Sequence, residues 1–276
     1  MQIRDYSLPS GWFPRDSNSI SAFLSDFNNS AGLCRAAISP HAGWYYSGRI
    51  AAAGVSSLKP DAETIIVIGG HLSSNSPPLF AMEDAVKTPF GPMPIDTDLR
   101  SLLKKELKGS EDRYRDNTVE VLLPMVRFFF RDAMLLWLRL PACIDSFESG
   151  KIISEVSVKL NRKVNVLAST DLTHYGSNYG FSPQGSGIAA LNWVRNVNDA
   201  AFIKVVESGS SAEVIRCANE DHSSCSAGAV LGVMGFAKAE NFANARLLEY
   251  ATSAEMEKGS VPDSFVGYAA FSFDDR

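Results

Sequence analysis

Short apolar runs alternate with stretches of helical periodicity along most of this chain. Runs of strand length, bounded by glycine, proline or polar residues, occur at 33–39, 64–69, 134–140 and 163–169. Helical patterns follow or separate them at 48–58, 96–107, 119–130 and 147–160. Strands that alternate with helices favour a parallel sheet covered by helices. The pattern therefore predicts an α/β fold with a doubly wound, mostly parallel sheet and helices on both faces.

Further elements are expected at both ends of the chain. The sequence predicts a short helix at 19–27, helical segments over 186–219 and 227–237, and two last strands at 246–250 and 265–273. No internal repeat, low-complexity tract or linker divides the 276 residues, of which 45% are hydrophobic. A chain of this length and composition can bury one sizeable core. We expect a single domain over 1–276.

Charge and hydropathy exclude several classes of partner. The formal net charge is −5, and no basic cluster or tail is present, so a nucleic-acid partner is not expected. No apolar run reaches the roughly 18 residues that a membrane helix requires, and the first residues contain no apolar signal core. The four cysteines form no CxxC pair and do not suggest a disulfide framework. The sequence thus predicts a soluble, cytoplasmic protein without a membrane partner.

Three of the four histidines follow predicted strands. His41 comes after the strand at 33–39, His71 after that at 64–69, and His174 after that at 163–169. Open α/β sheets place their chemistry at the carboxyl ends of strands, and neighbouring strands lie about 5 Å apart. We expect the three imidazoles to converge on one pocket. The alternative for each is a capped turn with an incidental histidine.

His41 and His71 suggest a site for a first-row divalent metal, because neutral imidazoles are common ligands of such ions. A third ligand is needed. Cys225 is the preferred candidate because a thiolate binds metals strongly, although a free cysteine is often a buried apolar side chain instead. The rival ligands are Glu120, Asp171 and His222, the last at a three-residue spacing from Cys225.

Asp171 and His174 form a second candidate constellation. A carboxylate three residues before an imidazole either sets the imidazole tautomer or lies beside it in the pocket, and a histidine beside a metal can act as a general acid or base. We therefore assign catalytic roles to both residues. The alternative is a helix-capping aspartate and a histidine that satisfies the loop backbone.

Aromatic residues accompany the histidines along the sequence. Trp44, Tyr45, Tyr46, Tyr175 and Tyr179 are candidates for an apolar-walled pocket that takes a planar molecule, and Trp44, Tyr45 and Tyr175 are the predicted substrate contacts. Tyr46 and Tyr179 lie in the same stretches. The alternative is that these rings are ordinary core and rim residues.

Several motifs occur in one order over most of the chain. They are Ser-Pro-His-Ala-Gly-Trp at 39–44, Gly-His at 70–71, Thr-Pro-Phe-Gly at 88–91, Asn-Thr-Val-Glu-Val-Leu-Leu-Pro at 117–124, Ser-Thr-Asp-Leu-Thr-His-Tyr-Gly at 169–176, and Cys225. Together they resemble the Memo family, including the Memo-like protein B component of AmmeMemoRadiSam systems.

The resemblance implies a fold similar to that of class III extradiol (LigB-like) dioxygenases. Those non-haem Fe(II) enzymes open catechol-type rings with O₂, using two histidines, a glutamate and a histidine base. By motif, His41 and His71 would be the histidine ligands, Cys225 would stand near the place of the glutamate, and His174 near that of the base. Iron is the metal that the fold implies, whereas a soft cysteine ligand shifts the preference toward zinc or copper.

The sequence therefore predicts a Memo-like metal-binding protein with oxidoreductase or dioxygenase-like chemistry on a small substrate, for which an aromatic ring is one option. Metal-assisted hydrolysis is a weaker option. The main alternative is a non-catalytic binding module that uses the same pocket for a peptide or an anionic ligand, because the family is also linked to phosphotyrosine peptides. The resemblance further implies AmmeMemoRadiSam partner proteins, among them a radical SAM protein.

Overall fold

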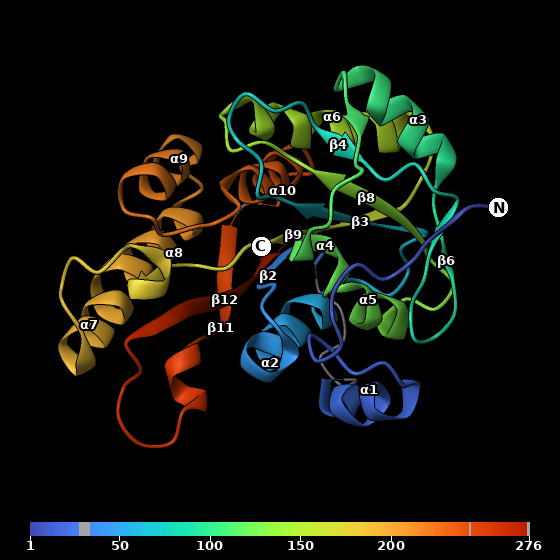
Figure 1. Cartoon of the computed structure of the whole chain (residues 1–276). Helices are drawn as coiled ribbons and strands as arrows, with labels where there is room; N and C mark the ends of the chain where they lie inside the picture. The colour runs from blue at the N-terminus through green and yellow to red at the C-terminus, as the bar shows by residue number, and fades with distance from the viewer. Residues whose placement is uncertain (28–33, 243, 275–276) are drawn as a thin grey trace.

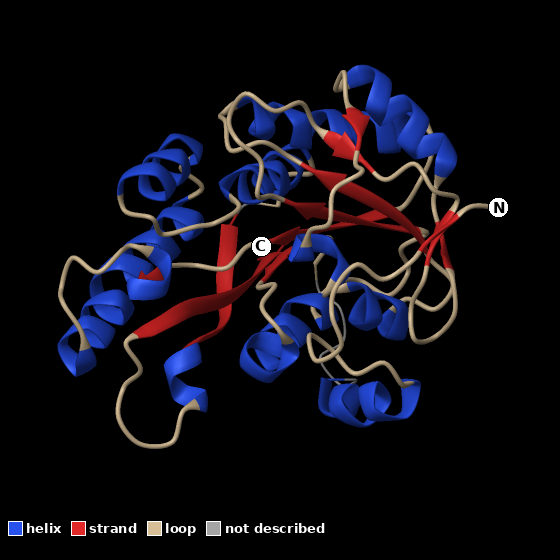
Figure 2. Cartoon of the chain, viewed as in Figure 1, coloured by secondary structure: helices blue, strands red, loops and turns tan. Residues whose placement is uncertain are grey.

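A computed structural model describes residues 1–27, 34–242 and 244–274 of the chain. Within these residues a nine-stranded sheet crosses the molecule (Figures 1 and 2). Its strands are β2 (Ala36–Ser39), β3 (Thr64–Gly69), β4 (Leu79–Phe80), β7 (Ser110–Glu111), β8 (Met134–Arg139), β9 (Val164–Ser169), β10 (His174–Gly176), β11 (Asn244–Thr252) and β12 (Ser264–Asp274). A small separate sheet joins β1 (Ile3–Arg4), β5 (Ala85–Val86) and β6 (Met93–Pro94).

The central strands of the large sheet are parallel. The order is β10-β12-β2-β9-β3-β8-β4-β7, with β11 paired to β12. Strands β2, β9, β3 and β8 run parallel, while β12 and β4 pair with them in the antiparallel direction. The predicted α/β class and mostly parallel sheet are confirmed, and the antiparallel flanks make the sheet mixed.

Helices cover both faces of the sheet, because alternate strand residues point to opposite sides. Ile66 and Ile68 of β3 belong to one core cluster, and Ile65 and Val67 belong to the other. The first cluster lies under α3 (Thr97–Glu106), α6 (Asp145–Lys159) and α10 (Ala227–Ala239), and the second under α1 (Ser17–Leu24), α2 (Trp44–Ser56) and α5 (Leu123–Phe129) (Figure 1). Burial on both sides explains why the strands are apolar throughout.

Further helices lie beside the β11–β12 end of the sheet. They are α7 (Gly187–Trp193), a π-helical turn (Val194–Asn198), α8 (Asp199–Ser208) and α9 (Ser211–Glu220) (Figure 1). The predicted helical stretch 186–219 is therefore divided, and Gly209, at φ +74°, ends α8 in the left-handed region that favours glycine. Short 3₁₀ turns occur at Ser25–Phe27, Ser177–Tyr179 and Ser253–Met256.

Three predicted boundaries are wrong, two of them for local reasons. Helix α2 begins at Trp44 instead of 48, because the carbonyl of Trp12 accepts the free N–H of Trp44 at 2.8 Å. The predicted helix 119–130 is divided into α4 (Asn117–Glu120) and α5, and Pro124 sits in the first turn of α5, where it needs no N–H. The first strand, expected at 33–39, begins at Ala36, and position 33 lies outside the described residues.

The helices α6 and α10 approach closely at glycines. A Cβ atom added to Gly150 would overlap the carbonyl oxygen of Gly232. We expect Gly150→Ala to force these helices apart and to lower the free energy of unfolding by about 3 kcal/mol, which corresponds to a loss of about 6–12 °C in Tm. Glu155→Ala, on the exposed face of the same helix, should change stability by less than about 0.5 kcal/mol. Thermal denaturation measures both, and equal Tm values would contradict this packing argument.

Among the described helices, none has both the length and the apolar character needed to cross a bilayer.

Candidate metal centre

The three predicted histidines lie at neighbouring strand ends. His41 follows β2, His71 follows β3, and His174 opens β10 shortly after β9. The rings of His41 and His71 are perpendicular, with centroids 5.0 Å apart. The pairing of β2 and β3 with the same strand, β9, brings these two ends to one edge of the sheet.

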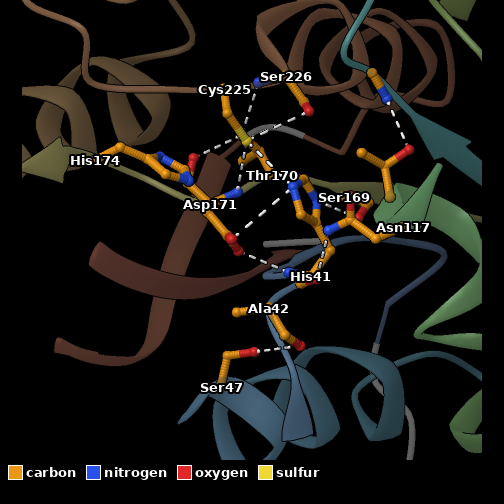
Figure 3. A network of polar contacts seen from close by, with 12 residues as sticks. His41, Ala42, Ser47, Asn117, Ser169, Thr170, Asp171, His174, Cys225 and Ser226 are labelled. Carbon is orange, nitrogen blue, oxygen red and sulfur yellow. Dashed lines mark hydrogen bonds and ion pairs between the residues drawn. The ribbon is translucent and has the colours of Figure 1, made fainter. Parts of the chain in front are cut away.

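Cys225 reaches this edge from the loop that precedes α10. Its Sγ lies 3.2 Å from Nε2 of His41 (Figure 3). The ligand atoms of His41, His71 and Cys225 all lie within 4.8 Å of one another. Bond lengths of about 2.0 Å to nitrogen and about 2.3 Å to sulfur place donor atoms about 3.5 Å apart around a tetrahedral ion. The group therefore has the donor types and the spacing to hold a metal ion.

The sulfur and both imidazoles are oriented by neighbouring groups. The backbone N–H of Asp171 donates to Sγ of Cys225 at 3.3 Å, which fixes the position of the sulfur beside His41. Nδ1 of His41 lies 2.8 Å from Oγ of Ser169, and Nδ1 of His71 lies 3.1 Å from Oδ2 of Asp116. With Nδ1 engaged, Nε2 of each ring is left for a metal, the usual arrangement at metal-binding histidines.

His71 and Asp116 form an ion pair. Burial by itself lowers the pKa of His71, but hydrogen bonds to Asp116 and Cys225 outweigh it and raise the pKa to about 9. Burial raises the pKa of Asp116, but His71, Thr118 and the nearby Arg139 charge together lower it to about 2. In the metal-free protein His71 is therefore protonated at neutral pH, and metal binding must displace that proton.

The carboxylate of Asp116 has two separate tasks. Oδ1 accepts the N–H of Thr118 at 2.9 Å and caps α4, whereas Oδ2 faces His71 and lies 3.7 Å from Nη1 of Arg139. An asparagine can keep the capping oxygen, so Asp116→Asn changes mainly the side that faces His71. The substitution therefore isolates the orientation of the metal-binding ring.

We expect Asp116→Asn to weaken metal affinity by about 10-fold to 100-fold, because the partner that orients His71 loses its charge. In the metal-free protein the raised pKa of His71 stabilises the fold below pH 6.5, and this contribution is lost as the pH rises through about 9. The lowered pKa of Asp116 stabilises it above pH 3.8, a contribution lost as the pH falls through about 2. The loss of stability in Asp116→Asn, relative to wild type, should therefore be largest between pH 3.8 and pH 6.5.

Chelator competition and denaturant unfolding at several pH values measure the two effects. Asp16→Asn is the matched control, because the side chain of Asp16 also caps a helix, α1, and Asp16 is not among the residues that line the cavity. A metal affinity equal to that of the control would show that Asp116 does not orient His71 for metal binding.

His174 presents one free nitrogen to the cavity. Its Nδ1–H donates to the carbonyl of Leu172 at 3.1 Å, which leaves Nε2 as an acceptor. Burial lowers the pKa of His174, and the charge of Asp171 offsets part of this effect. The ring is therefore neutral at pH 7, the state that a general base requires.

Asp171 lies beside His174 and supports His41 directly. Its Oδ1 accepts the backbone N–H of His41 at 2.7 Å, and its Oδ2 is 3.9 Å from Nε2 of the same ring (Figure 3). The sequence offered two roles for Asp171: to set the tautomer of His174 or to lie beside its ring. The carbonyl of Leu172 binds Nδ1 of His174, which leaves Asp171 the second role. Asn117 adds a second support, because its Nδ2 donates to the His41 carbonyl at 3.0 Å.

Of the three rival ligands, Asp171 borders the cluster, whereas Glu120 and His222 lie outside it. Glu120 is buried, and its carboxylate accepts the backbone N–H groups of Ser7 and Leu8, so it anchors the N-terminal segment. The ring of His222 packs against Phe181, with centroids 4.7 Å apart. Neither belongs to the group of converging ligand atoms.

The cluster opens into a cavity of about 680 Å³. Pockets of this size suit small-molecule ligands. Its lining includes His41, His71, Asn117, Asp171, His174, Trp12, Tyr46, Tyr179, Tyr268 and Glu257.

The three predicted substrate contacts, Trp44, Tyr45 and Tyr175, do not line the cavity, so this part of the prediction was wrong. Trp44 is buried in the core and donates its Nε1–H to the Val121 carbonyl at 2.9 Å. Tyr45 is 62% exposed, and Tyr175 is fully buried and stacked on Phe265. Successive helical residues turn by about 100° around the axis, which is why Trp44 and Tyr45 of α2 face away from the cavity.

Other rings form the wall instead. Tyr46, the next residue of α2, and Tyr179 were among the candidate pocket residues in the sequence, and both line the cavity. Trp12 and Tyr268 were missed, because one lies in a polar lead-in and the other in an apolar strand. The period-two alternation of β12 was the one local signal that could have found Tyr268, since Val266 and Tyr268 share a face.

Comparisons with known proteins show which proteins this chain is similar to. The profile described as "Memo-like protein" matches residues 4–272. A "MEMO1 family protein" of Pyrobaculum arsenaticum is 31% identical over 247 residues, which cover 85% of this chain and 81% of that protein. Another, of Pyrococcus abyssi, is 27% identical over 286 residues and covers 96% of this chain and 97% of that protein. A crystal structure of an uncharacterized Escherichia coli K12 protein aligns with TM-score 0.45 and 12% identity, over 77% of this chain and 87% of that one.

Proposed function

The chain belongs to the Memo-like family, and from that premise we propose that His41, His71 and Cys225 bind a non-haem metal for oxidoreductase, dioxygenase-like chemistry on a small substrate. The observation that carries the proposal is the convergence of the three ligand atoms within 4.8 Å at the edge of a 680 Å³ cavity. The proposal treats residues 1–276 as one Memo-like domain with a doubly wound sheet similar to that of class III extradiol dioxygenases.

The ligand set decides which metals suit the site. Iron is the metal of the dioxygenases that the fold resembles, and two histidines are compatible with it. A cysteine in place of a carboxylate also suits copper or zinc, because a thiolate is a soft ligand. A bound metal would supply Lewis-acid chemistry and, in the case of iron or copper, a redox centre.

The chain's own residues supply proton transfer and positioning. His174 would accept a proton from a substrate hydroxyl at Nε2, because Nδ1 is committed to the Leu172 carbonyl. Asp171 and Asn117 hold the backbone of His41 on its N–H and C=O sides. Ser169 and Asp116 fix the two imidazoles. The cavity offers room for a substrate ring beside the ligands.

The alternative, a binding module for a peptide or an anionic ligand, has less support. Among the lining residues that the structure describes there are two carboxylates, Asp171 and Glu257, and no lysine or arginine. Anion sites in proteins are usually built from arginine, lysine or helix N-termini. We also propose a radical SAM partner protein of the AmmeMemoRadiSam type, and membership of the family is the only support for it.

Elemental analysis tests the proposal on protein purified without an affinity tag or chelator. Near-stoichiometric iron, copper or zinc would support it. If the protein contains no metal and takes up none of Fe(II), Cu(I) or Zn(II) under anaerobic conditions, the metalloprotein hypothesis is wrong and the cavity is better treated as a binding site.

A further inference from the structure

Aromatic rings and carboxylates line the same cavity as the proposed metal ligands. Tyr46 of α2, Tyr179 and Tyr268 of β12 line it together with Trp12 from the N-terminal segment. The carboxylates of Asp171 and Glu257 line the same cavity. Four rings and two acidic groups thus meet in one space, although they come from distant parts of the sequence.

The phenols and Asp171 lie close enough to affect one another. The ring of Tyr179 packs edge-on against His174, with centroids 4.9 Å apart. Burial raises the pKa of Tyr179, and the charge of Asp171 and the phenol of Tyr46 raise it further. Burial, Asp171, Tyr179 and Tyr46 raise the pKa of Tyr268 in the same way. Added negative charge is therefore unfavourable in this part of the cavity.

A bound metal would give the ligand group the opposite charge. A divalent ion held by two neutral imidazoles and one thiolate leaves a net charge of +1. A ligand that matches both the metal centre and the aromatic wall would place an electron-rich oxygen near His41 and His71 and a positive charge near the rings.

We propose that the cavity binds an aryl amine, with its ammonium group held over Tyr46, Tyr179 and Trp12 and its hydroxyl directed toward His41 and His71. Aromatic faces attract cations through the ring quadrupole, most strongly where water is excluded. The carboxylates of Asp171 and Glu257 add a favourable Coulomb interaction. The direction of the hydroxyl rests on the proposed metal site, whereas binding of the ammonium group rests on the rings and carboxylates alone.

Three phenols that differ in charge test the proposal, because a single hydroxyl chelates metals poorly. They are tyramine, which is cationic, 4-ethylphenol, which is neutral, and 4-hydroxyphenylacetate, which is anionic. Ligand-observed NMR titrations at low ionic strength would be run on the metal-free and the zinc-loaded protein. We expect tyramine to bind at least about fivefold more tightly than either of the other two phenols.

Variants of the cavity wall and matched controls locate the preference. Tyr179→Leu should weaken tyramine binding by about threefold to tenfold, through loss of one aromatic face. Glu257→Gln should weaken it by about twofold to fivefold. Both should leave 4-ethylphenol binding nearly unchanged. Tyr114→Leu and Glu155→Gln remove the same groups from exposed positions outside the cavity and should have no effect.

Three results would overturn the inference. They are the absence of tyramine binding at millimolar concentration, equal or tighter binding of 4-hydroxyphenylacetate, and a tyramine preference that survives Tyr179→Leu. Metal content is measured on the same samples. If the protein prefers tyramine but takes up no metal, the proposed function is wrong and the cation site stands. If the protein binds metal but shows no preference for tyramine, the cation site is wrong and the proposed function stands.

Discussion

Cys225→Ser should remove most of the bound metal from the protein. The substitution replaces a thiolate by a hydroxyl, which is a poor ligand at neutral pH, and leaves two imidazoles to hold the ion. Changes in groups that only orient a ligand cost about 10-fold to 100-fold in metal affinity, so loss of a ligand should exceed about 100-fold. Elemental analysis after dialysis against a weak chelator measures the loss.

Two comparisons make this result specific to the site. Cys143→Ser is the matched control, because Cys143 is a free cysteine outside the ligand group, and the metal content of this variant should equal that of wild type. His41→Ala should lose metal as Cys225→Ser does, since both residues contribute ligand atoms to one group. If Cys225→Ser keeps wild-type metal while His41→Ala loses it, Cys225 is a buried thiol and the ligand set must be revised.

His174→Gln should keep the metal and lose turnover by about 10²-fold to 10⁴-fold, the usual contribution of a general acid or base. Glutamine has a similar size but cannot accept and release a proton near neutral pH. Oxygen consumption by the iron(II)-loaded protein with 4-methylcatechol is the measurement. Because burial lowers the pKa of His174 below 6.5, the wild-type rate should rise with pH along a limb below 6.5, and this limb should be absent in the variant.

His222→Gln provides the matched control for this experiment, because His222 packs against Phe181 away from the ligand cluster. It should retain both metal and turnover. Loss of metal in His174→Gln would mean that His174 supports the structure of the site instead of proton transfer. A metal-loaded wild-type protein that consumes no oxygen with this probe would refute the dioxygenase-like part of the proposal.

The sheet and the histidine edge could be predicted because their signals are local. Strands that are buried on both faces must be apolar along their whole length, and the segment 64–69 was therefore placed correctly to the residue. Residues after parallel strands meet at one edge of a sheet, so His41 and His71 could be paired from their positions alone. The loop of Cys225 has no such positional signal, so this residue was chosen for the chemistry of its thiolate, and the family motifs agreed with that choice.

The cavity wall and the partners of the ligands could not be read from the sequence. Asp116 contacts His71 across a separation of 45 residues, and Glu120 holds the backbone at Ser7 and Leu8 across more than 110 residues. Which of three successive aromatic residues at 44–46 faces the cavity depends on where α2 begins, and that depends on a hydrogen bond to Trp12.

The sequence by itself thus determined the order of strands and helices and the residues that end the central strands, because the period and length of apolar runs follow from burial of each element. Tertiary structure alone decided which polar groups orient His41 and His71, which rings line the cavity, and that acidic groups share it. Those features depend on side-chain directions in elements far apart along the chain, and packing fixes such directions only once the sheet and its helices are assembled.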